Sequence, residues 1–181
     1  MATGGNMVRI LIFNAWLFTV SFAGAEVVSQ NKDWIGERDV MTILGVEGCV
    51  AQTTIQEKDP SGVLTNTYRL QVIKLKSPQG GYSNPIVVSF PDNVLSEAYF
   101  EGTAQTNNSK VISLTLLQPD NNLPAKVVGT RYSDRIDLTR RLRRDDEVTI
   151  GFKDQQDIVK SVQYSLSGSA KTIQETGEAC Q

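Results

Sequence analysis

The stretch Thr67-Tyr-Arg-Leu-Gln-Val-Ile-Lys-Leu75 decides the fold class of this chain. Tyr68, Leu70 and Val72 fall on one side of an extended backbone, Lys74 continues that side, and the residues between them fall on the other. Alternation with a period of two is the pattern of a β-strand whose two faces have different surroundings. We therefore expect this segment to be one strand of a sheet.

Similar segments surround this strand and are separated by turn-forming residues. We predict further strands over residues 34–44, 49–57, 85–90, 97–102, 110–117, 126–132, 148–152 and 158–166. Turns are expected at Gly45–Gly48 and at Asp59-Pro-Ser-Gly62, where Pro fixes φ and Gly permits positive φ. Short strands with turns between them are typical of antiparallel sandwiches and barrels. The sequence predicts an all-β fold, an antiparallel β-sandwich or barrel-like sandwich with one or two short helices near the C-terminus.

Two segments near the C-terminus have helical patterns. In residues 134–145, Leu138 and Leu142 are four apart and form a short apolar stripe, with an acid at the N-terminal end. A second short helix is expected to follow Ser167 and to end near Gly177.

Residues 1–25 have the pattern of a secretory signal peptide. Arg9 precedes an apolar run, Ile10–Phe22, and Ala23-Gly-Ala25 follows with small residues at a cleavage site. The apolar run is shorter than the about 20 residues that a spanning helix needs, so a membrane anchor is the weaker alternative. With either Met1 or Met7 as the start, we expect a periplasmic or secreted protein whose single β-rich domain covers residues 26–181.

Cys49 and Cys180 are the only cysteines of the chain. In an oxidising compartment an even count of cysteines is read first as a disulfide, and two free thiols are the alternative. This bond would tie an early strand to the C-terminal end. On the chain-entropy model, closing so long a loop stabilises the fold by roughly 5 kcal/mol.

The composition argues against most catalytic chemistry. There is no His, which removes Ser-His and Cys-His pairs and His-ligated zinc, and the cysteine spacing gives no CxxC metal site. No Gly-rich phosphate loop is present, and a net charge of −2 gives no general attraction to nucleic acid. We predict a protein that is not an enzyme and has neither metal nor small-molecule cofactor; a hydrolase that uses carboxylates alone remains the alternative.

One cluster of residues has the character of a binding site. Basic residues are concentrated in the predicted helix, and the candidate anion-binding residues are Arg135, Arg140, Arg141 and Arg144. Such a ridge suits a lipid headgroup, a sulfated glycan or an acidic protein partner, and it allows peripheral membrane association. The alternative is a solvated helix face whose charge is neutralised by the neighbouring acids.

The order of motifs resembles the invasion-associated locus B family of bacterial exported proteins. The resemblance rests on the strand Gly48-Cys-Val-Ala-Gln52, the basic helix, the strand Glu147-Val-Thr-Ile-Gly-Phe-Lys-Asp154 and the closing Tyr164-Ser-Leu-Ser-Gly168. Members often carry a second Cys pair before the basic helix, where this chain has Thr130-Arg-Tyr-Ser133. The resemblance implies an envelope-associated β-sandwich without known catalysis, linked in some pathogens to host-cell invasion. It carries over no functional residues.

These observations favour an envelope protein that binds a protein or another envelope component. A periplasmic inhibitor of an enzyme such as lysozyme is the related alternative, with the loop Pro78–Asn84 as its candidate binding loop. An acid pair with raised pKa values in a cleft would instead indicate the hydrolase.

Overall fold

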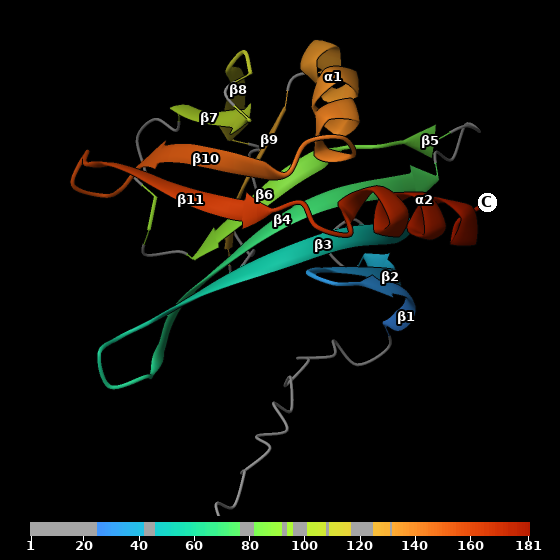
Figure 1. Ribbon diagram of the computed structural model, residues 1–181, viewed down its shortest axis with the longest axis horizontal. Helices are drawn as coiled ribbons and strands as arrows, with labels where there is room; N and C mark the ends of the chain where they lie inside the picture. The colour runs from blue at the N-terminus through green and yellow to red at the C-terminus, as the bar shows by residue number, and fades with distance from the viewer. Residues whose placement is uncertain are drawn as a thin grey trace, which may run out of the picture.

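The computed structural model describes residues 25–41, 46–76, 82–91, 94–95, 101–107, 109–116, 125–130 and 132–181. Residues 1–24, which contain almost all of the predicted signal peptide, lie outside the described residues. Within the described part, the chain forms eleven strands and two helices (Figure 1). Neither helix is long and apolar enough to cross a membrane.

Strands occupy most of the described chain. They are β1 (Glu26–Asn31), β2 (Trp34–Met41), β3 (Val46–Lys58), β4 (Leu64–Lys76), β5 (Tyr82–Ser83), β6 (Ile86–Pro91), β7 (Glu101–Thr106), β8 (Ile112–Leu116), β9 (Ala125–Thr130), β10 (Glu147–Lys153) and β11 (Val159–Ser165). The helices are α1 (Tyr132–Leu142), between β9 and β10, and α2 (Ser169–Ala179), after β11.

All strand pairs in the described part are antiparallel and belong to one sheet. Its order is β1-β2-β3-β4-β6-β9-β8-β7-β10-β11, with the short β5 paired beside β4. The two ends of this order, β1 and β11, do not pair with each other in the described part, so the sheet is not closed into a barrel. The predicted all-β class and the antiparallel pairing are confirmed.

The sheet curls until its two halves face each other across one core. Tyr68 on β4 and Phe90 on β6 belong to one half, and Phe152 on β10 belongs to the other. The ring centroids of Phe90 and Phe152 nevertheless lie 4.9 Å apart, and those of Tyr68 and Phe152 lie 6.1 Å apart. Aromatic rings at these separations are in direct contact. The two halves therefore pack as the layers of a sandwich.

Strand β4 has the two faces that its sequence predicts. Tyr68, Leu70 and Val72 are buried in the main core. On the opposite face, Ile73 joins a smaller buried cluster with Val50 of β3 and with Val87 of β6. The antiparallel register between β3 and β4 is continuous from the Gly48–Leu75 pair to the Glu57–Asn66 pair and keeps this alternation in step, before it shifts between Glu57 and Lys58.

The Asp59–Gly62 turn between β3 and β4 has the predicted chemistry. The Asp59 carboxylate accepts hydrogen bonds from the backbone N–H groups of Ser61 and Val63, both at 2.9 Å, and Gly62 takes a φ of 85°. These hydrogen bonds, with that of the Ser61 hydroxyl first, lower the pKa of Asp59.

Several boundaries differ from the predicted ones. Strand β1 was not expected, because Glu26–Asn31 has no clear alternation. The expected turn at Gly45–Gly48 overlaps β3, which begins at Val46. Of the strand expected over residues 97–102, the last two residues lie in β7 and residues 97–100 lie outside the described residues. The expected helix ends at Leu142, three residues early, and its buried Leu138 and Leu142 confirm the apolar stripe.

Helix α2 packs closely on β1 and β2 because small residues face each other there. The buried positions of α2 are Ser169, Thr172 and Thr176. A Cβ atom placed on Gly36 of β2 would lie 2.0 Å from Oγ1 of Thr176, so only glycine fits at this contact. Gly168, the N-cap of α2, has a left-handed backbone (φ 92°). It too requires glycine, because a Cβ there would lie 2.1 Å from the carbonyl oxygen of Asn31.

Replacing Gly36 with Ala should lower the free energy of unfolding by about 2 kcal/mol, the cost of overpacking a filled contact. Thr176→Ala in the same chain should recover part of this loss, because it removes the Oγ1 atom that the added Cβ would meet. This Oγ1 is buried without a hydrogen-bond partner, so no hydrogen bond is lost with it. Gly177→Ala is the control in the same helix, since nothing lies within 4 Å of its added Cβ. Urea unfolding of the four chains measures the effect; a double variant no more stable than Gly36→Ala would contradict this account of the contact.

Candidate functional site

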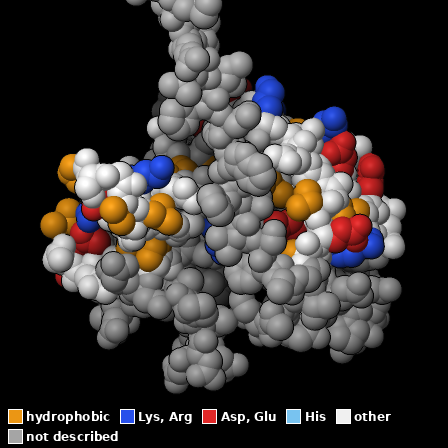
Figure 2. All heavy atoms as spheres, turned by 90° about the horizontal axis from the view of Figure 1, so that it is seen from below, with side chains coloured by type: hydrophobic (Ala, Val, Ile, Leu, Met, Phe, Trp, Pro, Cys, Tyr) orange, Lys and Arg blue, Asp and Glu red, His pale blue; other side chains and the backbone are white. Residues whose placement is uncertain are grey.

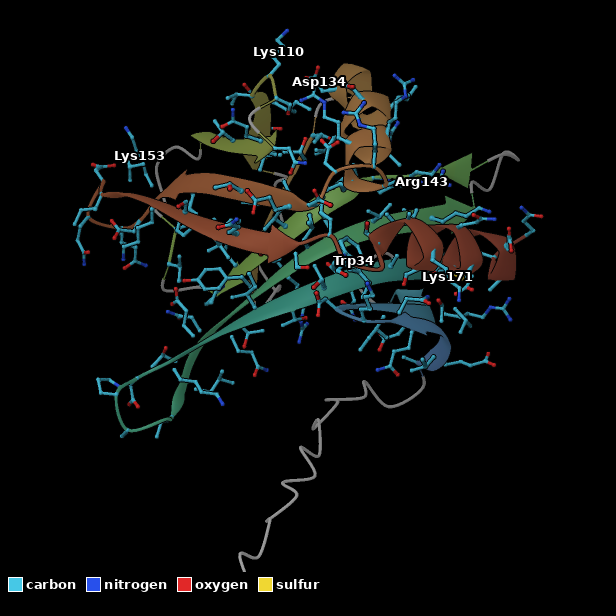
Figure 3. The ribbon with its side chains drawn as sticks, in the orientation of Figure 1. Trp34, Lys110, Asp134, Arg143, Lys153 and Lys171 are labelled. Carbon is cyan, nitrogen blue, oxygen red and sulfur yellow. A yellow bond between two sulfur atoms is a disulfide. The ribbon has the colours of Figure 1, made fainter. Side chains whose placement is uncertain are left out.

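Helix α1 distributes its arginines over two sides. Arg135, Arg140 and Arg143 line a hollow between α1 and α2, together with Asn84, Ile136, Thr139 and Ala170. We call this hollow, of about 660 Å³, the α1–α2 groove. At 3.6 residues per turn, the lining positions 135, 136, 139 and 140 of α1 fall within about 140° of the helix circumference, and Arg143, one residue after the end of α1, continues the same side. Figure 3 shows Arg143 at the end of α1 nearer to α2.

The groove continues into a second hollow of about 320 Å³. The two hollows share Asn84, Thr139 and Arg143. The second one is lined by residues of β3, β4 and α2. Its lining includes Cys49, Lys74 and Ile173 among others. The site is therefore a trough with α1 on one side and α2 on the other.

Arg141 and Arg144, on the remaining side of α1, are held by other groups. The Arg141 guanidinium forms an ion pair with Asp137 at 2.5 Å and donates hydrogen bonds of 2.6 Å to the Ser109 hydroxyl and the Lys110 carbonyl. Only 12% of its side chain is exposed, so Arg141 fastens the helix to the loop before β8.

Arg144 is paired with the residue that follows it. Its Nε lies 2.8 Å from Oδ1 of Asp145, and this pairing is the main cause that lowers the pKa of the Asp145 carboxyl. The side chain of Arg144 is 68% exposed, so the pair adds little to stability. The charge of Arg144 is nevertheless balanced locally.

The arginines of the groove have different surroundings. Among the described residues, neither Arg140 nor Arg143 forms an ion pair or any other polar contact, and both are exposed. Arg135 is half-buried and has a partner of its own. Asp137 and Asp145 thus pair with Arg141 and Arg144, whereas the described lining of the groove contains three arginines and no acid.

Three residues in one row of the sheet hold the wall of the groove formed by α2. Arg38 of β2, Cys49 of β3 and Lys74 of β4 are direct cross-strand partners. Cys49 forms the disulfide with Cys180, the residue that caps α2, and the two Cα atoms lie 6.0 Å apart over a sequence separation of 131. The side chains on either side of Cys49 also bind the end of α2. Arg38 donates a hydrogen bond to the carbonyl of Ala179, and Lys74 donates one to the carbonyl of Gly177.

Cations are favourable at this position for a general reason. The last carbonyl groups of a helix have no intrahelical partner and carry the negative end of the helix dipole. Lys74 and Arg38 supply both the missing donors and the opposite charge. The row therefore fixes the end of α2 by a covalent bond and two charged hydrogen bonds.

The middle of α2 is held by polar contacts with β1. The Glu175 carboxylate accepts hydrogen bonds from the Ser29 hydroxyl at 2.5 Å and from Nδ2 of Asn31 at 2.9 Å. These bonds, with that of Ser29 the largest, lower the pKa of Glu175 below its ordinary value of 4.5. Lys171 contributes less, with its ammonium 3.6 Å from the other carboxylate oxygen.

No family model matches the sequence, and the comparison with curated proteins finds no match. Among solved structures, the crystal structure of invasion associated protein B from Bartonella henselae is similar, with a TM-score of 0.56. The alignment covers 85% of this chain and 98% of that chain. The two chains share a fold. The resemblance predicted from the sequence is thus confirmed as a distant one, because only 9% of the residues are identical.

The structure separates the four candidate anion-binding residues. It places Arg135 and Arg140 in the groove and assigns Arg141 and Arg144 to contacts elsewhere. It adds Arg143, which the candidate set left out although Arg143 stands three residues after Arg140 and eight after Arg135. This spacing is the signal in the sequence that could have identified Arg143 as part of the site.

Stability in acid should depend on Glu175. A carboxyl whose pKa is lowered by folding stabilises the protein above its unfolded pKa, and this contribution is lost as the pH falls through the folded pKa. Glu175→Gln should therefore be less stable than the wild type near pH 7, and the difference should shrink below about pH 4. Urea midpoints across this range test the prediction, and a difference that does not change with pH would contradict it.

Proposed function

We propose that this protein is an exported, non-catalytic binding module of the bacterial envelope that holds an anionic partner in the α1–α2 groove. The distribution of charge on α1 carries the proposal. Arg140 and Arg143 face the groove without ion pairs in the described part of the chain, whereas Asp137 and Asp145 neutralise the arginines on the other side. A charge left unbalanced in a concave site favours a ligand of opposite sign.

The excess of positive charge in the groove is not a property of the whole chain. On the face of the molecule seen from below, acidic and basic side chains lie near one another among the described residues (Figure 2). The chain as a whole has a net charge of −2. Attraction of an anion would therefore be local to the groove.

Export is supported by the disulfide and by the signal-like pattern of residues 1–25. Disulfides persist in oxidising compartments and are rare in the cytosol, and Cys49–Cys180 joins distant parts of the described fold. The solved structure with the same fold is named as an invasion-associated protein, which leads us to propose host-cell interaction as the setting in which the module works.

Carboxylate catalysis is not favoured by the acids that the structure describes. A general acid needs a raised pKa, but the resolved shifts of Asp59, Asp145, Asp154 and Glu175 are all downward. Each of these acids accepts hydrogen bonds in a turn, an ion pair or a helix contact. The loop Pro78–Asn84, proposed for an inhibitor, lies mostly outside the described residues.

Fractionation of the native bacterium tests the proposal. We expect the protein in the envelope fraction as a chain that begins at Glu26, with Cys49 and Cys180 resistant to alkylation. The Arg140→Gln, Arg143→Gln double variant should be released from that fraction at lower salt than the wild type, because salt screens exposed charges. Intact mass spectrometry and a salt-elution series make the two measurements.

Cytoplasmic protein with an uncleaved N-terminus and two alkylatable thiols would contradict export. Equal salt release of the wild type and the double variant would contradict a role of the groove in envelope association.

A further inference from the structure

The positive charges of the groove are spread along a defined length of the chain. Arg135 lies on α1 and Arg143 lies one residue after its end, eight positions later, so at the helical rise of 1.5 Å per residue their Cα atoms are about 12 Å apart along the axis. Arg140 lies between them. A ligand that meets all three must therefore present anionic groups over about this distance, rather than a single charge.

The type of basic residue favours anions that present two oxygen atoms side by side. Among the described residues, the three cations that line the groove are all arginines, and the guanidinium fork matches a carboxylate or a phosphate through two parallel hydrogen bonds. A bilayer surface suits this groove poorly, because the lining side chains surround a hollow and a flat surface would reach only its rim. The shape instead favours a narrow segment that can lie along α1.

The groove also offers apolar contact between its charges. Ile136 is 66% exposed although it stands beside Arg135, and Ala170 of α2 lines the opposite wall. An exposed isoleucine in a hollow is suited to a ligand that carries apolar groups as well as charges. This favours a peptide over a sulfated or phosphorylated glycan.

An extended peptide has the matching repeat. Its side chains on one side recur about every 6.7 Å, so acids at three alternate positions span about 13 Å. Asn84 lies at the junction of the two hollows, where its side-chain amide can pair with a peptide backbone. We propose that the α1–α2 groove binds an extended acidic peptide segment of a partner protein, with acids at alternate positions, two of them paired to Arg140 and Arg143 and one lying beside Arg135. This inference rests on the proposed function and names the class of its partner.

Fluorescence anisotropy with a labelled peptide tests the inference directly. The probe is a seven-residue peptide with Glu at three alternate positions and Val between them, and its control has Gln in place of each Glu. Residues 26–181 with the disulfide intact should bind the acidic peptide and not the amide peptide. Arg140→Gln with Arg143→Gln should weaken binding by at least about tenfold, because two charged hydrogen-bonding groups are lost.

A matched variant keeps the result specific to the groove. Lys110→Gln with Arg144→Gln removes the same charge from outside the groove, and Figure 3 shows Lys110 far from Arg143. This variant should bind the acidic peptide within about twofold of the wild type, since only screened long-range attraction is lost. Urea unfolding of both double variants checks that neither loses its fold.

Three outcomes would overturn the inference. They are equal binding of the amide peptide, equal weakening by the matched variant, and no peptide binding while vesicles of anionic lipid or a sulfated oligosaccharide bind in a manner that requires Arg140 and Arg143. The last outcome would give the groove a different occupant and leave the proposed function intact. Failure of the proposed function is seen separately, in the fractionation of the native protein.

Discussion

The structure depends on how one row of the sheet holds the end of α2. Arg38, Cys49 and Lys74 are neighbours across β2, β3 and β4, and each makes a bond to the last turn of the helix or its cap. The antiparallel register places the three side chains side by side on the same face of the sheet. Without that register, the disulfide and the two cations would not meet the same helix end.

These bonds to the end of α2 are important because α2 lies beside the opening of the curled sheet, between β1 and β11. The helix packs on β1, β2 and β3 and follows directly after β11, so it connects the two ends of the strand order. Two further contacts support the closure: the Trp34 indole donates a hydrogen bond of 3.0 Å to the carbonyl of Ser165, and the Ser169 hydroxyl donates one of 2.6 Å to the carbonyl of Leu142. The second contact fixes α2 against the end of α1. The same packing that completes the core therefore also sets the two walls of the groove.

Local patterns in the sequence were sufficient for the fold class and for much of the element order. The alternation around Leu70 and the turn chemistry of Asp59–Gly62 depend on neighbours in the chain, and both are found as predicted. Strand β1 was missed because its pairing with β2, and not its own pattern, makes it a strand. The requirement for glycine at Gly36 depends on Thr176, which is remote in sequence, so no local pattern reveals it.

The candidate site shows the same limit. The sequence identifies α1 as the basic element, but adding its charges suggests near neutrality, because acids flank the arginines on both sides. Folding assigns Asp137 to Arg141 and Asp145 to Arg144, and it places Arg140 and Arg143 in the hollow beside α2. Which side of α1 faces that hollow is fixed by the burial of Leu138 and Leu142 against the core. This information is tertiary, so the helix could be predicted and its binding side could not.

Hydrogen exchange of α2 tests most directly whether the row of Arg38, Cys49 and Lys74 holds the helix in place. The comparison is between the wild type and a Cys49→Ser, Cys180→Ser variant under conditions in which both remain folded. Amides of residues 169–179 should exchange faster in the variant, while those of the β10–β11 pair keep their protection. Unchanged protection of α2 would show that the helix end does not need the disulfide and would contradict the account.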